Sequence, residues 1–190
     1  WEGDEALSET YSLQIDLATQ DVNPDYLKLL GCRATFQILD EGENHWHGRI
    51  TSVELTGFEA DDADNAGLSY LYLRVTLEPQ MALLRQDVTP RVHTLPSNTR
   101  QLSTLIRHAM RKCDLRPERV EGPDEEDQTA PYYGIFLEDD IDQWSGKDFF
   151  FQYQESTLDF LSRHLEHRGA YFWFEQYDDN EEVVFCSTNR

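Results

Sequence analysis

The pattern that decides the fold lies in one stretch, Phe151-Gln152-Tyr153-Gln154-Glu155-Ser156-Thr157-Leu158-Asp159-Phe160-Leu161-Ser162-Arg163-His164-Leu165-Glu166, and in the Gly169-Ala170-Tyr171-Phe172-Trp173-Phe174-Glu175 that follows it. Ser156 and Asp159 have the spacing of a capping box, in which an N-cap hydroxyl and an acid three residues later satisfy free amides at the start of a helix. Leucines then recur on one helical face, at Leu158, Leu161 and Leu165. The stretch therefore predicts a strand, a capped helix and a second strand.

Three details of this helix are open to test. Asp159 is shorter than the Glu or Gln that the box usually takes. Asp159 and Arg163 stand four residues apart, so we expect an ion pair worth a few tenths of a kcal/mol between them. Gly169 is expected to end the helix with a positive φ, which glycine adopts at little cost.

The rest of the second half continues this β-α-β pattern. Residues 171–174 and 183–185 predict a hairpin around Asp178-Asp179-Asn180, and 149–153 and 132–137 predict a strand and an edge strand. Residues 117–131 are rich in Pro, Glu and Asp and indicate an exposed connector. Before it, an amphipathic helix capped by Ser97 or Thr99 is predicted by the spacing of Leu102, Leu105, Ile106, Ala109 and Met110.

The first half has the period of half-buried strands instead. Apolar and polar residues alternate at 11–17, 33–39, 45–57 and, most clearly, 71–77. The apolar phase of the third strand shifts between Ile50 and Val53, which indicates a bulge. A short helical turn at 26–30 is expected to end at Gly31. We therefore predict an α+β protein, with a small antiparallel β-barrel in domain 1–92 and a β-α-β-rich subdomain in domain 93–190.

Charge and composition exclude several classes of function. The formal net charge of −21 opposes binding to nucleic acid or anionic lipid, because proteins bind these anionic surfaces mainly through Lys and Arg side chains. Aromatic residues at 12% favour a folded chain. No apolar run of membrane-spanning length and no signal peptide is visible, so we expect no membrane anchor. The three widely spaced cysteines, Cys32, Cys113 and Cys186, indicate reduced thiols rather than a disulfide framework or zinc site.

The deciding stretch resembles the hub signature of the VgrG (Rhs element Vgr) family, which reads QYxESDxxFxxRLxExxGxxYxFE. Thr157 replaces the usual Asp, and His164 stands where a Leu normally follows the Arg. Further blocks are similar to family segments in the same order: Gly3 to Glu9, Leu29-Leu30-Gly31, His47-Gly48-Arg49-Ile50-Thr51, and Tyr72 to Pro79 running into Leu83-Leu84. Gln80 and Met81 replace a usual Trp-Leu, and Arg91-Val92-His93-Thr94 matches the family's RIFQ segment only loosely.

The resemblance implies a structural part of a contractile injection machine, similar to a phage baseplate hub, rather than an enzyme. Such a hub would be a homotrimer joining the inner-tube protein ring to a C-terminal spike and baseplate components, with effector cargo as a further possible partner. It would assemble in the bacterial cytoplasm and be ejected to the extracellular space or a target cell. The resemblance marks as structural residues Gln152, Tyr153, Glu155, Ser156, Asp159, Phe160, Arg163, Gly169, Tyr171, Gly48 and Pro79.

Two other functions remain as alternatives. The same hub fold serves prophages with contractile tails, as a late-control tail protein, and the sequence does not distinguish the two machines. An enzyme from another class would use the acidic run Glu138-Asp139-Asp140 with Asp142 as paired carboxylates. No nucleophile or phosphate-loop motif accompanies that run, so we expect no catalytic residue and no cofactor.

Three patterns carry metal-ligand residue types, and for each the structural interpretation is favoured. His45 and His47 share a strand face, without an evident third ligand. His164 and His167 share a helix face, without the HExxH order. Residues 61–67 resemble a calcium loop, but Ala66 and Leu73 stand where oxygen ligands are needed. We therefore expect no metal site.

Overall fold

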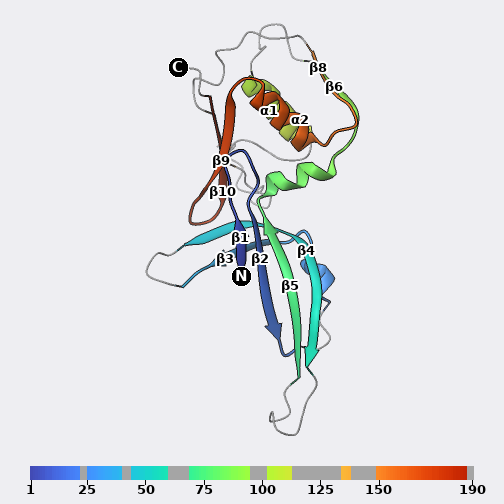
Figure 1. Cartoon of the computed structure of the whole chain (residues 1–190), viewed down its shortest axis with the longest axis vertical. Coiled ribbons are helices and arrows are strands. Elements are labelled where there is room, and N and C mark those ends of the chain that lie inside the picture. The colour runs from blue at the N-terminus through green and yellow to red at the C-terminus, as the bar shows by residue number, and fades with distance from the viewer. Residues whose placement is uncertain are drawn as a thin grey trace, which may run out of the picture. The chain divides into compact units, whose positions relative to one another are not determined.

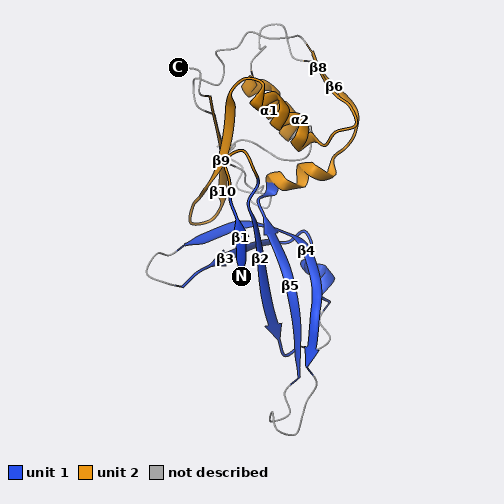
Figure 2. Cartoon of the chain, in the orientation of Figure 1, with its two compact units in different colours: residues 1–5, 10–80 blue, residues 6–9, 81–190 orange. Residues whose placement is uncertain are grey.

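The computed structural model describes residues 1–21, 25–39, 44–59, 69–94, 102–112, 134–137 and 149–187 (Figure 1). The chain forms two compact units (Figure 2). Unit 1 comprises residues 1–5 and 10–80, and unit 2 comprises residues 6–9 and 81–190. The sequence suggests a different division, a domain boundary between residues 92 and 93 of a hub module, and that boundary stays a prediction.

Unit 1 is built on a five-stranded antiparallel sheet in the order β1-β2-β5-β4-β3. Its strands are β1 (Glu2–Asp4), β2 (Ser12–Thr19), β3 (Arg33–Gln37), β4 (His45–Glu59) and β5 (Tyr70–Glu78). The central strand β5 buries alternate residues, Leu71, Leu73, Val75 and Leu77, as its sequence predicts. Leu13 of β2 and Tyr11 just before it are buried, but Leu17 is 42% exposed, so the apolar face of β2 is less buried toward its end.

Strand β4 is long and irregular. Its register against β5 shifts between Ile50 and Ser52, where the phase change predicts a bulge, and again between Leu55 and Gly57, where no bulge was expected. Gly48 of β4 approaches the end of β5 so closely that only glycine fits there. A Cβ there would meet the Glu78 carbonyl oxygen at 2.3 Å, well inside contact distance.

The sheet of unit 1 curls like part of a barrel. β1 and β3 are its two edge strands, yet Trp1, directly before β1, contacts Phe36 of β3 with ring centroids 5.5 Å apart. Trp46 lies 6.0 Å from the same Trp1 ring. Over the described residues the hydrogen-bonded order ends at β1 and β3, so the predicted barrel is a curled antiparallel sheet whose edges approach through aromatic side chains. The short helix η1 (Tyr26–Leu29) precedes Gly31, whose φ of 81° confirms the predicted turn.

Unit 2 combines two small sheets with two helices. Its elements are η2 (Gln80–Gln86, whose first residue belongs to unit 1), β6 (Arg91–Thr94), α1 (Leu102–Lys112), β7 (Gly134–Leu137), β8 (Phe149–Gln152), α2 (Thr157–Glu166), β9 (Ala170–Gln176) and β10 (Glu181–Ser187). β9 and β10 form the predicted hairpin, and β7 joins β10 in parallel at the edge of the sheet. β6 and β8 pair with each other, which the sequence did not predict.

The helices of unit 2 bury the faces that their spacing predicts. Leu105, Ile106, Ala109 and Met110 of α1 are completely buried, as are Phe160 and Leu161 of α2. Gly169, with a φ of 65°, ends α2 and confirms the predicted helix stop. Neither α1 nor α2 is long and apolar enough to cross a membrane, nor is any other helix in the described ranges. The predicted cap at Ser97 or Thr99 and the connector at 117–131 lie outside the described residues.

Candidate functional site at the β8–α2 junction

The junction between β8 and α2 is a tight turn followed by a side-chain cap. Gln154 has a φ of 53°, a left-handed conformation that is uncommon for a residue other than glycine. The Ser156 hydroxyl accepts a hydrogen bond from the Asp159 amide at 3.0 Å, which confirms the predicted N-cap. The Asp159 carboxylate then accepts from the Ser156 hydroxyl at 2.7 Å. The short acid thus closes the cap through the hydroxyl, where a longer Glu would reach the N-cap amide.

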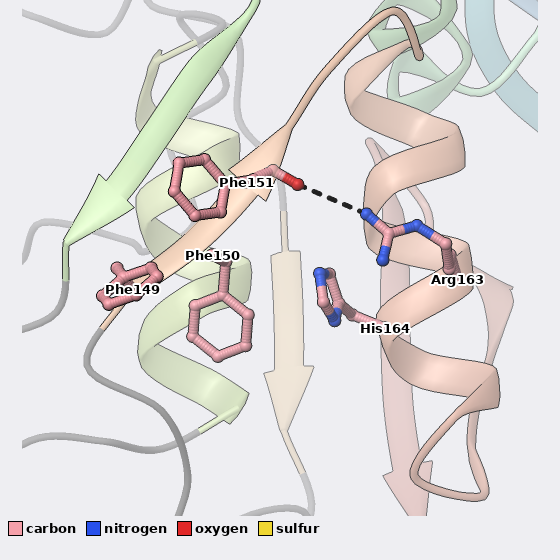
Figure 3. A pocket seen from close by; sticks show the side chains of 5 residues that line it. All are labelled: Phe149, Phe150, Phe151, Arg163 and His164. Carbon is pink, nitrogen blue, oxygen red and sulfur yellow. Dashed lines mark hydrogen bonds between the residues drawn. The ribbon is translucent and has the colours of Figure 1, made fainter.

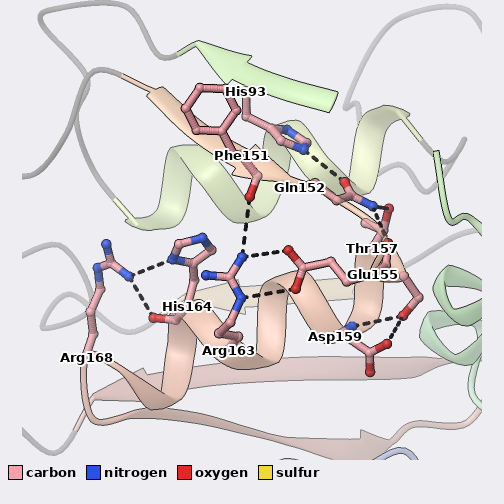
Figure 4. Close-up of polar contacts among 10 residues, drawn as sticks. His93, Phe151, Gln152, Glu155, Thr157, Asp159, Arg163, His164 and Arg168 are labelled. Atoms are coloured by element: carbon pink, nitrogen blue, oxygen red, sulfur yellow. Dashed lines mark hydrogen bonds and ion pairs between the residues drawn. The ribbon is translucent and has the colours of Figure 1, made fainter. Parts of the chain in front are cut away.

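Arg163 fixes the turn to the helix. Its Nε and Nη2 donate to the two carboxylate oxygens of Glu155, at 3.1 and 2.6 Å, and Nη2 also donates to the Phe151 carbonyl at 3.4 Å (Figure 4). The expected ion pair between Asp159 and Arg163 is therefore wrong. Asp159 is held in the cap, and Glu155 offers the guanidinium a two-point contact that helical spacing alone does not predict.

A buried chain of polar groups runs behind the turn. The His93 Nε2 contacts the Gln152 Oε1 at 3.1 Å, and the Gln152 Nε2 donates to the Thr157 hydroxyl at 3.0 Å. That hydroxyl donates to the Asp87 carboxylate at 2.6 Å, and Asp87 also pairs with Arg91. The Thr157 amide donates to the Asp87 carbonyl at 2.8 Å. Since His93 and Thr157 are fully buried and Gln152 is 1% exposed, this chain ties β6, β8, α2 and the end of η2 into one frame.

Thr157 stands where the hub signature has Asp, and its contacts explain this departure. The signature has a carboxylate at this position, whereas here the carboxylate facing the site comes from Asp87. The Arg91 guanidinium lies beside both groups, so its charge is already matched by Asp87. A hydroxyl at 157 suits this arrangement because it donates to one carboxylate and accepts from Gln152.

The structure brings together most, but not all, of the signature residues. Gln152, Glu155, Ser156, Asp159 and Arg163 meet at the junction, and the buried Phe160 ring stacks on His93 with centroids 4.6 Å apart. Tyr153 is adjacent in sequence but 68% exposed. Tyr171 stacks on Trp173 in β9, and Gly169 ends α2. Gly48 and Pro79 belong to unit 1, where Gly48 closely approaches the Glu78 backbone and Pro79 is buried.

Sequence reasoning missed His93, Asp87 and Arg91 as members of the site. For Arg91 and His93 the only signal was the loose match at Arg91-Val92-His93-Thr94, which gave no reason to single out one residue, and Asp87 lies outside that segment. Their role depends on the pairing of β6 with β8, a contact between distant segments.

A pocket of about 220 Å³ opens beside the junction. It is lined by Phe149, Phe150, Phe151, Arg163 and His164 (Figure 3). His164 packs edge-on against Phe150 and Phe160, with centroids 4.9 and 4.7 Å apart. Burial of the ring, helped by the positive charges of Arg163 and Arg168, lowers the pKa of His164 to about 4. The imidazole is therefore neutral at physiological pH.

The other candidate patterns do not converge on a second centre in the described ranges. The His45 and His47 rings lie 5.1 Å apart on one face, and the His47 Nδ1 contacts the Thr35 hydroxyl at 2.9 Å across the strand pair. His164 is half-buried while His167 is exposed. No group of three or more His, Cys, Asp or Glu side chains within the described segments is arranged to hold a metal ion. The acidic run at 138–142 and the loop at 61–67 lie outside those segments.

Neither of the two described cysteines, Cys32 and Cys186, forms a disulfide. Cys32 is exposed and contacts the Lys28 carbonyl at 3.0 Å. Cys186 is buried, with its sulfur 3.2 Å from the Tyr171 hydroxyl. Cys113 lies outside the described residues.

Comparisons with known proteins agree with this architecture. The family model described as phage tail baseplate hub (GPD) matches residues 4–97 and 138–190. Among solved structures, the E. coli c3393 protein is similar in fold, with a TM-score of 0.70 and 20% identity, covering 96% of this chain and 44% of that one. That protein is described as a component of the type VI secretion system with structural similarity to the T4 bacteriophage tail proteins gp27 and gp5. A search of curated proteins found no match.

Proposed function

The chain belongs to the phage tail baseplate hub (GPD) family, and from that premise we propose that it is a structural hub component of a type VI secretion tube and spike. The observation that carries the proposal is the family match to 4–97 and 138–190, which includes the β8–α2 junction. The fold likeness to a type VI secretion component favours a secretion machine. The chain spans less than half the length of that structure, so spike and partners are part of the proposal.

The chemistry of the junction supports a mechanical role. Three of the polar groups that the signature marks at the junction hold another part of it: Ser156 caps α2, Arg163 binds Glu155, and Gln152 binds Thr157. The Gln152–Thr157 contact is buried, so breaking it leaves an unsatisfied group, and it therefore fixes one geometry. A hub that transmits axial force needs such a fixed geometry. We therefore propose that the chain has no catalytic activity of its own.

The proposed assembly is a ring of three copies between the inner-tube protein and a spike, with baseplate components and effector cargo as further partners. Copies related by rotation would meet through unlike faces, a contact that closes into a ring. The complex would form in the bacterial cytoplasm and leave the cell when the sheath contracts. The acidic charge of −21 agrees with partners other than nucleic acid and membrane.

The test is release of the tagged full-length protein into the medium, from cells with an intact sheath and from cells whose sheath cannot contract. Sheath-dependent release without virions is expected. A matched Gly48→Ala variant serves as the control, because the close approach of Gly48 to Glu78 means that it should fail to fold and to be released. Equal release from both cell types would refute the proposal.

The prophage tail hub is the second candidate, because the matching family is itself named for phage tails. Recovery of the protein only inside induced virions would move the assignment to that machine. The hub role would then stand, and the secretion role would not.

A further inference from the structure

One face of the β9–β10 hairpin carries two stacked aromatic rings that the core of unit 2 does not use. Tyr171 and Trp173 alternate along β9 with the buried Phe172 and Phe174, so they lie on the opposite face of the sheet. Both rings are partly exposed, and their centroids lie 5.9 Å apart with 28° between the ring planes. The Tyr171 ring occupies one side of the indole, so a ligand would pack on the other side, toward Glu175.

Two carboxylates lie at the end of this aromatic face. Glu175 follows Trp173 on the same face of β9, and Glu182 of β10 is its direct cross-strand partner. The Glu175 carboxylate accepts hydrogen bonds from the Trp173 Nε1 at 3.2 Å and from the Tyr177 hydroxyl at 2.8 Å, so it is held beside the indole. Directly opposite residues of an antiparallel pair have Cβ atoms about 4.5–5.5 Å apart, which places both carboxylates within reach of one cation.

These two negative charges are not balanced within the described part of the chain. Neither Glu175 nor Glu182 forms an ion pair there, and on its other side Glu182 pairs with Gly134 of β7, which has no side chain. Like charges directly opposite each other destabilise a strand pair. Burial, and then the charge of Glu175, raise the pKa of Glu182. A cation placed between the two carboxylates would relieve this repulsion.

An arginine suits this arrangement better than other cations. Its planar guanidinium packs flat on an aromatic ring, and its several N–H groups can donate to two carboxylates at once. A lysine ammonium is a compact, strongly hydrated charge and gains less from the indole. A metal ion is not favoured, because no three His, Cys, Asp or Glu side chains of the described segments are grouped to hold one.

We propose that the face formed by Tyr171, Trp173, Glu175 and Glu182 binds an exposed arginine of a partner protein. The guanidinium lies between the Glu175 and Glu182 carboxylates and packs against the side of the Trp173 ring that Tyr171 leaves open. The net charge of −21 agrees with a partner that presents basic groups. The inference does not depend on the proposed hub role.

The test uses the whole chain with ¹⁵N-labelled tryptophan, because the Trp173 indole N–H contacts Glu175 and therefore reports on the site. A Trp173→Phe variant assigns its resonance. The probe is a capped glycine-arginine-glycine peptide at low ionic strength, where exposed charges are screened least. The comparison peptides carry citrulline, which has the shape of arginine without its charge, or lysine.

The arginine peptide should shift the Trp173 indole resonance and bind about fivefold more tightly than the citrulline peptide, because only arginine is attracted by the two carboxylates. The lysine peptide should bind with an affinity between the two. No shift of this resonance, or equal binding of the arginine and citrulline peptides, would overturn the proposal. Lysine binding as tight as arginine binding would overturn the assignment to arginine.

Two variants make the test specific to this face. Glu182→Gln removes one carboxylate together with the repulsion, so it should be at least as stable as the parent and bind the arginine peptide about fivefold more weakly. Glu166→Gln makes the same charge change at an exposed position of α2 and should bind as the parent does. Weaker binding without loss of stability separates a binding role from a structural one. If Glu182→Gln does not fold, Glu175→Gln takes its place, and unchanged binding in the folded variant would count against the site.

Discussion

The Arg163 guanidinium holds the Glu155 carboxylate through two nitrogens, at 3.1 and 2.6 Å, across the turn from β8 to α2. This pair spans eight residues, whereas the ion pair expected from helical spacing spans four. Two-point contact restricts both side chains to one arrangement, which a single exposed contact does not.

We expect a double-mutant cycle of Glu155→Ala and Arg163→Ala to give a coupling energy of about 0.5–1 kcal/mol, because the arginine is half-exposed and screened by solvent. Urea denaturation of the parent, the two single variants and the double variant measures this coupling energy. The matched cycle of Asp159→Ala with Arg163→Ala should give coupling near zero. Stronger coupling to Asp159 than to Glu155 would contradict the structure.

Thr157→Asp restores the signature residue, yet we expect it to destabilise this chain by about 2 kcal/mol or more, because two carboxylates would share one guanidinium. Asp87→Asn in the same chain should recover most of the loss, since it removes the second charge. Denaturant midpoints of the two single variants, the double variant and the parent give the answer. A Thr157→Asp protein as stable as the parent would refute the assignment of Asp87.

Gly169→Val should cost more than about 1 kcal/mol, because a β-branched residue is strained at positive φ. Gly169→Asn is the control, since asparagine tolerates this region better and should lose less. Thermal unfolding of both variants compares them. Unchanged stability in the valine variant would mean that the helix does not end through a left-handed residue.

The stability of unit 2 should fall as the medium becomes acidic because of His164. Its pKa of about 4 in the folded state lies below the ordinary value of 6.5, so the unfolded state takes up the proton first. The contribution is therefore fully present above about pH 6.5 and is lost as pH falls toward 4, by at most about 3 kcal/mol. Many carboxylates titrate over the same range, so the measurement is the difference from His164→Leu. A stability difference between the parent and His164→Leu that does not vary with pH would contradict the prediction. The control His167→Leu should show the same pH dependence of stability as the parent.

Sequence patterns predicted those elements whose geometry depends only on neighbouring residues. The alternation at Leu71–Val75 gave a buried strand face, and the Ser156–Asp159 spacing gave the cap, because in both cases neighbouring residues settle the geometry. The pairing of β6 with β8 and the parallel entry of β7 beside β10 join segments far apart in the chain. No periodicity records such contacts, so Asp87 and His93 could not be placed at the site in advance. Arg163 binds Glu155 instead of the predicted Asp159 for a different reason, because Asp159 is held in the cap by Ser156 and helical spacing does not show this competition.

Residues 6–9 belong to unit 2, although the segments on both sides of them belong to unit 1, and the Ser8 amide donates to the Phe172 carbonyl at 2.8 Å. A single cut at Gln80 therefore does not separate the two units cleanly. A C-terminal piece would lack the segment that covers this carbonyl of β9. During synthesis, residues 6–9 emerge early but find their place only when β9 has left the ribosome. The order of translation and the order of folding thus differ for this short segment, which would make unit 2 the slower of the two to complete.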